Sequence, residues 1–261
     1  MKKINIKFSI LAFVFAFSIF SCSKYETGED NASPIQNHGF GRTVMFEKIA
    51  SNASYADIPF FRTIASNQDQ VINFNVNTAA TDNSFTTSDF ASALPTSVTI
   101  PAGEKVAYAR INFVHSNLAF SDKRINFILT NPSETLNLTA TKLQFNYKAL
   151  CTQNEVTLAM TQDRYGSETT WNIKNSSGSV VWSGGPYTDL SSNTTLALPL
   201  QVNCLASGSY TLNVNDAYGD GMVTSASVFG KYELRRADGS VIVSGLGNAF
   251  TSTISHPFTL P

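Results

Sequence analysis

The feature that most constrains the fold is an internal repeat in the C-terminal part of the chain. Residues 171–184 and 232–245 each contain a strand-like run, a turn at Ser-Gly or Asp-Gly, and a returning run, and matched residues lie 61 positions apart. Alternating apolar and polar residues around such a turn predict a β-hairpin. Two related hairpins predict a pseudo-symmetric β-sandwich in which equivalent elements come together.

The repeat extends upstream of the hairpins. The Asp-x-Tyr-Gly motifs at 163–166 and 216–219 are 53 positions apart, as are Cys151 and Cys204. Each half is therefore predicted to run as cysteine, strand, Asp-x-Tyr-Gly loop and hairpin, with about eight additional residues after the second loop. The apolar positions of the two first strands are one residue out of register, which predicts a bulge or an extra loop residue in one half. These positions are Val156, Leu158 and Met160 against Tyr210, Leu212 and Val214.

The rest of the chain also has the pattern of β-structure. Short alternating runs are interrupted by Gly, Pro, Asn and Asp, and no long segment has helical periodicity. We predict an all-β protein with two β-sandwich domains in tandem, at 42–148 and 149–261. Charged residues are 14% of the chain, the formal net charge is −1 and no basic stripe is present, so nucleic acid is not an expected partner.

In the first domain, residues 97–100 and 106–114 are predicted strands joined by a Pro- and Gly-containing turn at 101–104. The second of these strands is predicted to place Ala107, Ala109, Ile111 and Phe113 on one face. A further strand is predicted around 125–129, with Ile125, Phe127 and Leu129 directed inward and with Asn131-Pro132 ending it.

The order of residues 98–103, a long strand and residues 125–132 is similar to that of a Calx-β domain, which is an Ig-like Greek-key sandwich. The resemblance implies a calcium site in an acidic cluster just before the last long strand. The matching stretch, 119–124, contains the carboxylate Asp122 and the cations Lys123 and Arg124. Calcium requires several oxygen ligands, so we expect this domain to be a metal-free structural spacer.

The N-terminus is predicted to export the chain. Lys2, Lys3 and Lys7 precede an uncharged run at 8–20 that is too short to span a bilayer, as in a secretory signal peptide. Residues 19–22, Ile-Phe-Ser-Cys, resemble the bacterial lipobox, which implies a signal peptide at 1–21 and lipidation of Cys22. The alternative is an ordinary cleaved signal followed by a chance cysteine.

Residues 22–41 are polar and contain Gly, Pro and Asn, which predicts a flexible lipidated tether. Ser23 is not Asp, so the inner-membrane retention signal of proteobacterial lipoproteins is absent. Residues 24–26 resemble the charged segment that directs Bacteroidota lipoproteins to the cell surface. We therefore expect a lipid-anchored protein of the outer membrane that faces outward.

With Cys22 lipidated, Cys151 and Cys204 are the remaining thiols. A pair of cysteines in an exported protein predicts a disulfide, and two buried free cysteines are the alternative. The pattern of residues 163–171, 204–210 and 216–221 resembles a β-sandwich module common in secreted and surface proteins of Bacteroidota, often beside peptidase or adhesion domains. The resemblance implies an accessory extracellular module.

The Asp-x-Tyr-Gly loops contain candidate metal ligands. An EF-hand is excluded, because Tyr218 and Ser227 occupy ligand positions three and twelve of a loop that begins at Asp216. A looser calcium site remains a candidate, and the alternative is a turn in which aspartate caps its own loop. The candidate calcium ligands are Asp163, Glu168, Asp216 and Asp220.

Aromatic residues in and beside the loops and hairpins are candidates for a glycan-binding surface, since sugars stack their apolar faces on rings. Burial in the core is the alternative, and it is favoured for Trp171. The candidate ligand-binding residues are Tyr165, Tyr218, Trp182 and Tyr187.

Catalysis is not expected. His38, His115 and His256 lie in different segments, and neither a His-Glu-x-x-His nor a Gly-x-Ser-x-Gly motif occurs. The sequence predicts a membrane-anchored, non-catalytic binding or adhesion module for a glycan or protein ligand. The alternative is a structural cell-envelope or gliding-associated lipoprotein without a small-molecule ligand.

Overall fold

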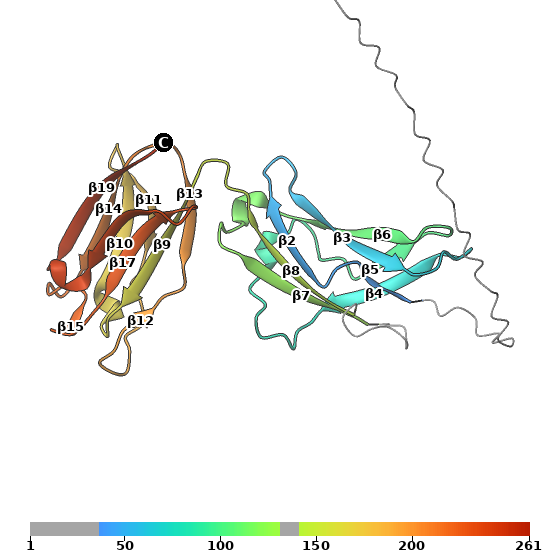
Figure 1. Cartoon of the computed structure of the whole chain (residues 1–261), viewed down its shortest axis with the longest axis horizontal. Coiled ribbons are helices and arrows are strands. Elements are labelled where there is room, and N and C mark those ends of the chain that lie inside the picture. The colour runs from blue at the N-terminus through green and yellow to red at the C-terminus, as the bar shows by residue number, and fades with distance from the viewer. Residues whose placement is uncertain (1–36, 131–140) are drawn as a thin grey trace, which may run out of the picture. The chain divides into compact units, whose positions relative to one another are not determined.

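The computed structural model describes residues 37–130 and 141–261. Cys22 lies outside these residues, as do the predicted signal peptide and most of the predicted tether. The described residues form an all-β structure, as predicted (Figure 1). None of the described helical segments is long and apolar enough to cross a membrane.

The first sandwich consists of two sheets around one hydrophobic core. The strands of the smaller sheet are, in order, β1 (His38–Phe40), β3 (Tyr55–Arg62) and β6 (Val106–Asn112). The strands of the larger sheet are β2 (Val44–Ile49), β8 (Lys142–Ala149), β7 (Lys123–Leu129), β4 (Gln70–Val76) and β5 (Ser97–Ile100). The β2–β8 pair is parallel and the other pairs are antiparallel. Two 3-10 turns, η1 (Thr87–Asp89) and η2 (His115–Asn117), lie between strands.

Alternation of side chains determines which face of each strand is buried. In and just after β6, Ala109, Ile111 and Phe113 are buried as predicted, and the inward row of β7 is also confirmed. The predicted tether is shorter than expected at its C-terminal end. His38–Phe40 forms β1 because Phe40 packs into the first core and the strand pairs with β3.

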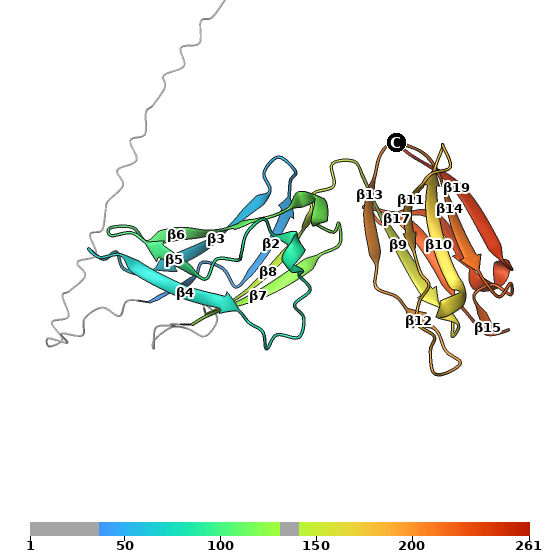
Figure 2. The same cartoon turned by 180° about the vertical axis from the view of Figure 1, so that it is seen from behind.

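The second sandwich has its own hydrophobic core and consists of a four-stranded and a five-stranded sheet, together with a small two-stranded sheet (Figure 2). One sheet contains, in order, β11 (Val180–Gly184), β10 (Thr169–Asn175), β14 (Gly208–Asp216) and β19 (Thr253–Leu260). The other contains β12 (Leu196–Ala197), β9 (Asn154–Gln162), β17 (Lys231–Arg236) and β18 (Val241–Leu246), and β13 (Gln201–Leu205) also pairs with β9. The remaining elements are the hairpin β15 (Val223–Ser225) and β16 (Val228–Phe229), and the 3-10 turns η4 (Gly166–Glu168) and η5 (Gly247–Ala249).

Strands of one half of the repeat pair with strands of the other half. The first strand of one half pairs with the hairpin of the other: β9 pairs with β17, and β14 pairs with β10. The first strands of the two halves were predicted to be one residue out of register. The second half accounts for this with one extra loop residue, because β9 begins three residues after Cys151 and β14 begins four residues after Cys204. Each half therefore completes the sheet of the other.

Candidate functional site

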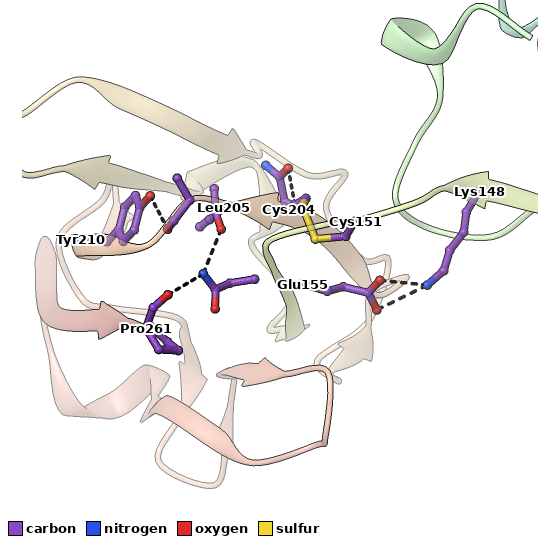
Figure 3. The surroundings of a disulfide bond; sticks show 10 residues. Lys148, Cys151, Glu155, Cys204, Leu205, Tyr210 and Pro261 are labelled. Carbon is purple, nitrogen blue, oxygen red and sulfur yellow. Dashed lines mark hydrogen bonds and ion pairs between the residues drawn. A yellow bond between two sulfur atoms is a disulfide. The ribbon is translucent and has the colours of Figure 1, made fainter. Parts of the chain in front are cut away.

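A disulfide joins the starting points of the two repeated halves. Cys151 and Cys204 are bonded, with Cα atoms 5.5 Å apart, which confirms the predicted pair and excludes two free thiols (Figure 3). The bond fixes the beginnings of β9 and β14 near each other. It closes a loop of about 54 residues and therefore stabilises the domain by roughly 4 kcal/mol through loss of chain entropy in the unfolded state.

Because β9 and β14 each have nine residues, they end at the same edge of the sandwich. Asp163 follows β9 directly, and Asp216 is the last residue of β14. The two Asp-x-Tyr-Gly loops are held together by backbone contacts: Thr169 is the register partner of Asp216, and the amide of Ala217 donates to the carbonyl of Glu168 at 2.9 Å. The repeated loops therefore converge.

Three carboxylates form a cluster at this edge, which we call the acidic cluster. Glu168, Asp216 and Asp220 each offer an oxygen within 4.8 Å of the others. Asp216 Oδ1 also accepts hydrogen bonds from the amides of Gly219 and Asp220, at 2.6 and 3.3 Å. Asp216 thus shapes its own loop, as the turn interpretation predicts, and at the same time contributes to the cluster.

Asp163 lies beside the acidic cluster and is only 1% exposed. Its Oδ2 accepts a hydrogen bond from Thr224 Oγ1 at 3.1 Å, whereas its buried Oδ1 has no partner among the described residues. Burial raises the pKa of Asp163 above its usual value, the charge of Asp216 adds to this rise, and hydrogen bonds from Thr224 and the backbone at Tyr165 offset only part of it. A buried carboxylate oxygen without a partner is costly, so this atom points to a missing donor or cation.

Glu168 experiences the same excess of negative charge. Burial, followed by the charges of Asp216, Asp220 and Asp163, raises its pKa. In the described part of the chain, no cationic side chain forms an ion pair with any of these four carboxylates. The carboxylates therefore repel one another without compensation.

Two buried neutral oxygens at the strand ends that flank the first Asp-x-Tyr-Gly loop were not predicted from the sequence. Gln162 Oε1 and Thr169 Oγ1 are buried without a partner, at the end of β9 and the start of β10. Together with Asp163 Oδ1 they are three of the four buried polar side-chain atoms without a partner in the described residues. Such residues give no signal in a single sequence, because Gln and Thr are common in strands of any function.

A hollow of about 360 Å³ opens next to the acidic cluster. Its walls contain one tyrosine from each Asp-x-Tyr-Gly loop: Tyr218 is 77% exposed and Tyr165 is 37% exposed. The residues that line it are Tyr165, Glu168, Tyr218, Asp220, Val223 and Thr224. The structure therefore places two of the predicted aromatic residues beside two of the predicted metal ligands.

The other two predicted aromatic residues belong elsewhere, which corrects the sequence-based grouping. Trp182 packs edge-on against Trp171, with ring centroids 4.9 Å apart. The Tyr187 hydroxyl accepts a hydrogen bond from Trp171 Nε1 at 2.7 Å and another from Gln201 Nε2. Both rings are half-buried against the second core, because the buried indole N–H requires an acceptor there.

In the first sandwich, cations occupy the stretch in which Calx-β domains carry acidic ligands. Lys123 Nζ pairs with the buried Asp89 at 2.7 Å, and Arg124 pairs with Asp82. Two carboxylates near this stretch, Asp82 and Asp89, therefore already have protein cations as partners.

No protein-family model matches the chain, and no curated protein matches it. Solved structures of related shape include CBD12 from CALX1.2, with 11% sequence identity and a TM-score of 0.32 over 78% of this chain and 82% of that chain. The calcium binding domain CBD12 of CALX1.1 has 12% identity and a TM-score of 0.34 over 68% and 79%. A two-domain protein of unknown function from Bacteroides fragilis has 8% identity and a TM-score of 0.34 over 85% and 94%.

Proposed function

We propose that the chain is a non-catalytic, calcium-dependent binding module whose binding end is formed by the two Asp-x-Tyr-Gly loops. The observation that carries this proposal is the acidic cluster of Glu168, Asp216 and Asp220, together with the buried, unpartnered Oδ1 of Asp163 beside it. An acidic cluster alone is common on protein surfaces. A buried carboxylate oxygen without a donor is rare and indicates that something positive belongs at this place.

The geometry of the cluster suits calcium. Calcium binds six to eight oxygens at about 2.4 Å, so two ligands of one ion lie at most about 4.8 Å apart. The three carboxylates meet this condition. A bound cation would relieve the mutual repulsion that raises the pKa of Glu168. Glu168, Asp216 and Asp220 would hold the ion, with the buried Asp163 beside them adding negative charge, and the ion would supply fixed positive charge and open coordination positions.

Thermal unfolding of the purified full-length protein, first freed of metal with a chelator, tests the calcium site. At ten times its Kd, calcium should stabilise the domain by about 1.4 kcal/mol. This corresponds to a rise in Tm of about 5 °C for a domain of this size. Asp216→Asn keeps the oxygen that accepts from Gly219 but removes the charge, so we expect it to fold and to lose most of the shift.

Asp238→Asn is the matched control, because Asp238 also caps its own turn, by accepting from the Ser240 amide, and lies outside the acidic cluster. It should keep the full calcium shift. If calcium leaves the Tm of the metal-free wild type unchanged, the site does not bind calcium and Asp216 is a turn residue alone.

The absence of catalysis and the location of the protein are also part of this proposal. His256, for example, is hydrogen-bonded through Nε2 to the Tyr232 hydroxyl at 2.8 Å, so its ring stabilises β17 and β19.

The lipobox-like residues 19–22 and Ser23 support export, lipidation of Cys22 and outward display on the outer membrane.

A further inference from the structure

The hollow beside the acidic cluster combines two kinds of surface. Tyr165 and Tyr218, which occupy equivalent positions in the two repeats, present rings on its walls. Glu168 and the exposed Asp220 line the same hollow and belong to the acidic cluster. A cation held by the cluster would therefore face the hollow and would be reached by a ligand lying between the two rings.

The coordination chemistry leaves room for such a ligand. This step rests on the proposed calcium site. The carboxylates of the acidic cluster supply only part of the six to eight oxygens that calcium takes. Because Asp220 and Glu168 are open to the hollow, the remaining positions face it and would be filled by waters or by oxygens of a ligand.

The negative charge of the carboxylates at this edge favours a neutral ligand over an anionic one. One divalent cation does not neutralise the four carboxylates at this edge, and no cationic side chain lines the hollow. The nearest basic residue in sequence, Arg164, donates through Nη1 to Asn193 and lies with its guanidinium 5.3 Å from the Tyr165 ring centroid. An anionic ligand would be repelled here, whereas neutral hydroxyl oxygens would bind the ion without adding charge.

We propose that this hollow binds a neutral saccharide, with two vicinal hydroxyls of one sugar ring on the calcium ion and an apolar sugar face against Tyr218. Sugar rings offer adjacent hydroxyls at the spacing of two ligands of one ion, and they offer C–H faces that stack on aromatic rings. Val223 adds an apolar contact, and Thr224, whose hydroxyl already donates to Asp163, stiffens the wall. The volume of about 360 Å³ is that of a small ligand pocket.

A glycan array probed with the purified full-length protein, in calcium and in chelator, tests the proposal. Neutral glycans should bind in calcium and be lost in chelator, and uronic-acid-containing glycans should not bind. Tyr218→Ala should weaken binding of the best neutral glycan by about fivefold or more, from the loss of ring stacking. The same variant should keep the full calcium-induced shift in Tm, because Tyr218 supplies no ligand to the ion.

Tyr108→Ala is the matched control, since Tyr108 is also an exposed tyrosine but belongs to the first sandwich, and it should bind like the wild type. If calcium raises the Tm but the array shows no neutral glycan, only acidic glycans, or binding that survives the chelator, the saccharide site is refuted while the calcium site stands. If calcium has no effect on the Tm, both proposals fail.

Discussion

At the scale of single residues, the partners of a buried carboxylate decide its role. Asp89 in the first sandwich is fully buried, and it accepts from Lys123 Nζ, the Tyr147 hydroxyl, and the amide and hydroxyl of Thr86. Burial alone would raise the pKa of Asp89, but these bonds outweigh it and hold the pKa below its usual value. Asp163 in the second sandwich is as buried but has no cation, so its pKa is raised. The first carboxylate is held by an ion pair and hydrogen bonds, whereas the second has no cation beside it among the described residues.

Asp89 gives a prediction about acid stability. Because its pKa is lower in the folded state than the unfolded value of about 3.9, its contribution is complete above that pH and is lost as the pH falls through the folded pKa. Asp89→Asn should lower the free energy of unfolding near neutral pH by roughly 3 kcal/mol, since it leaves Lys123 without its partner. It should also flatten the fall in stability below about pH 4. Urea unfolding across this pH range measures both effects.

Asp82→Asn is the control for that experiment, because Asp82 pairs with Arg124 at an exposed position, and the substitution should leave stability nearly unchanged. An Asp89→Asn protein whose stability follows the wild-type pH curve would contradict the structural role of the ion pair.

At the scale of elements, the two hairpins of the second sandwich are closely equivalent. Both carry a register shift at matched positions, after Ile173 in β10 and after Leu234 in β17. In both, a glycine of the returning strand lies across from a large buried ring: Gly184 faces Trp171 and Gly245 faces Tyr232. The absence of a side chain at these glycines is what allows the rings to lie flat against the neighbouring strand.

Gly245→Ala should therefore destabilise the second sandwich. A Cβ at this position would overlap the hydroxyl end of the Tyr232 ring, and at Gly184 it would lie 2.6 Å from the Trp171 ring. Because both rings are almost fully buried, they cannot move aside freely, and we expect a loss of about 1–3 kcal/mol for either variant. Denaturant unfolding compares them with Ser244→Ala, an exposed neighbour that should be nearly neutral; equal stability of all three would show that the rings adjust easily.

At the scale of the whole molecule, the described residues contain two sandwiches with separate hydrophobic cores. The first has protein cations against its carboxylates, whereas the second collects uncompensated carboxylates and exposed rings at one edge. This division supports a spacer role for the first sandwich and a contact role for the second.

The proposed attachment predicts that Cys22→Ala abolishes lipidation. The variant should no longer incorporate labelled fatty acid in cells and should leave the membrane fraction or retain its signal peptide, because stable anchoring requires acyl chains. Ser23→Ala, next to the proposed acylation site, should still be labelled. Normal fatty-acid incorporation into the Cys22→Ala protein would refute the anchor.

The strands, hairpins and disulfide could be predicted from the sequence because their signals are local or repeated. Alternation of period two identifies β6 and β7, the Gly178 and Gly239 turns mark the hairpins, and Cys151 and Cys204 are the pair of thiols that remains beside Cys22. The convergence of the two Asp-x-Tyr-Gly loops also follows, since strands of equal length that start at one disulfide end at one edge. The strand β3 was not predicted from the sequence, because Pro59 lies within it and proline is unusual inside a strand.

Only the tertiary structure decided which oxygens and rings share the site. The pairing of strands between the halves brings Glu168 next to Asp216 and places Thr224 against Asp163, across 48 and 61 positions of sequence. The same contacts pack the half-buried Tyr187 against Trp171 and leave Tyr218 exposed, although both tyrosines lie beside a turn. Burial and hydrogen-bond satisfaction depend on neighbours that are remote in sequence, so the pattern of residues determines the strands, and the three-dimensional contacts determine the site.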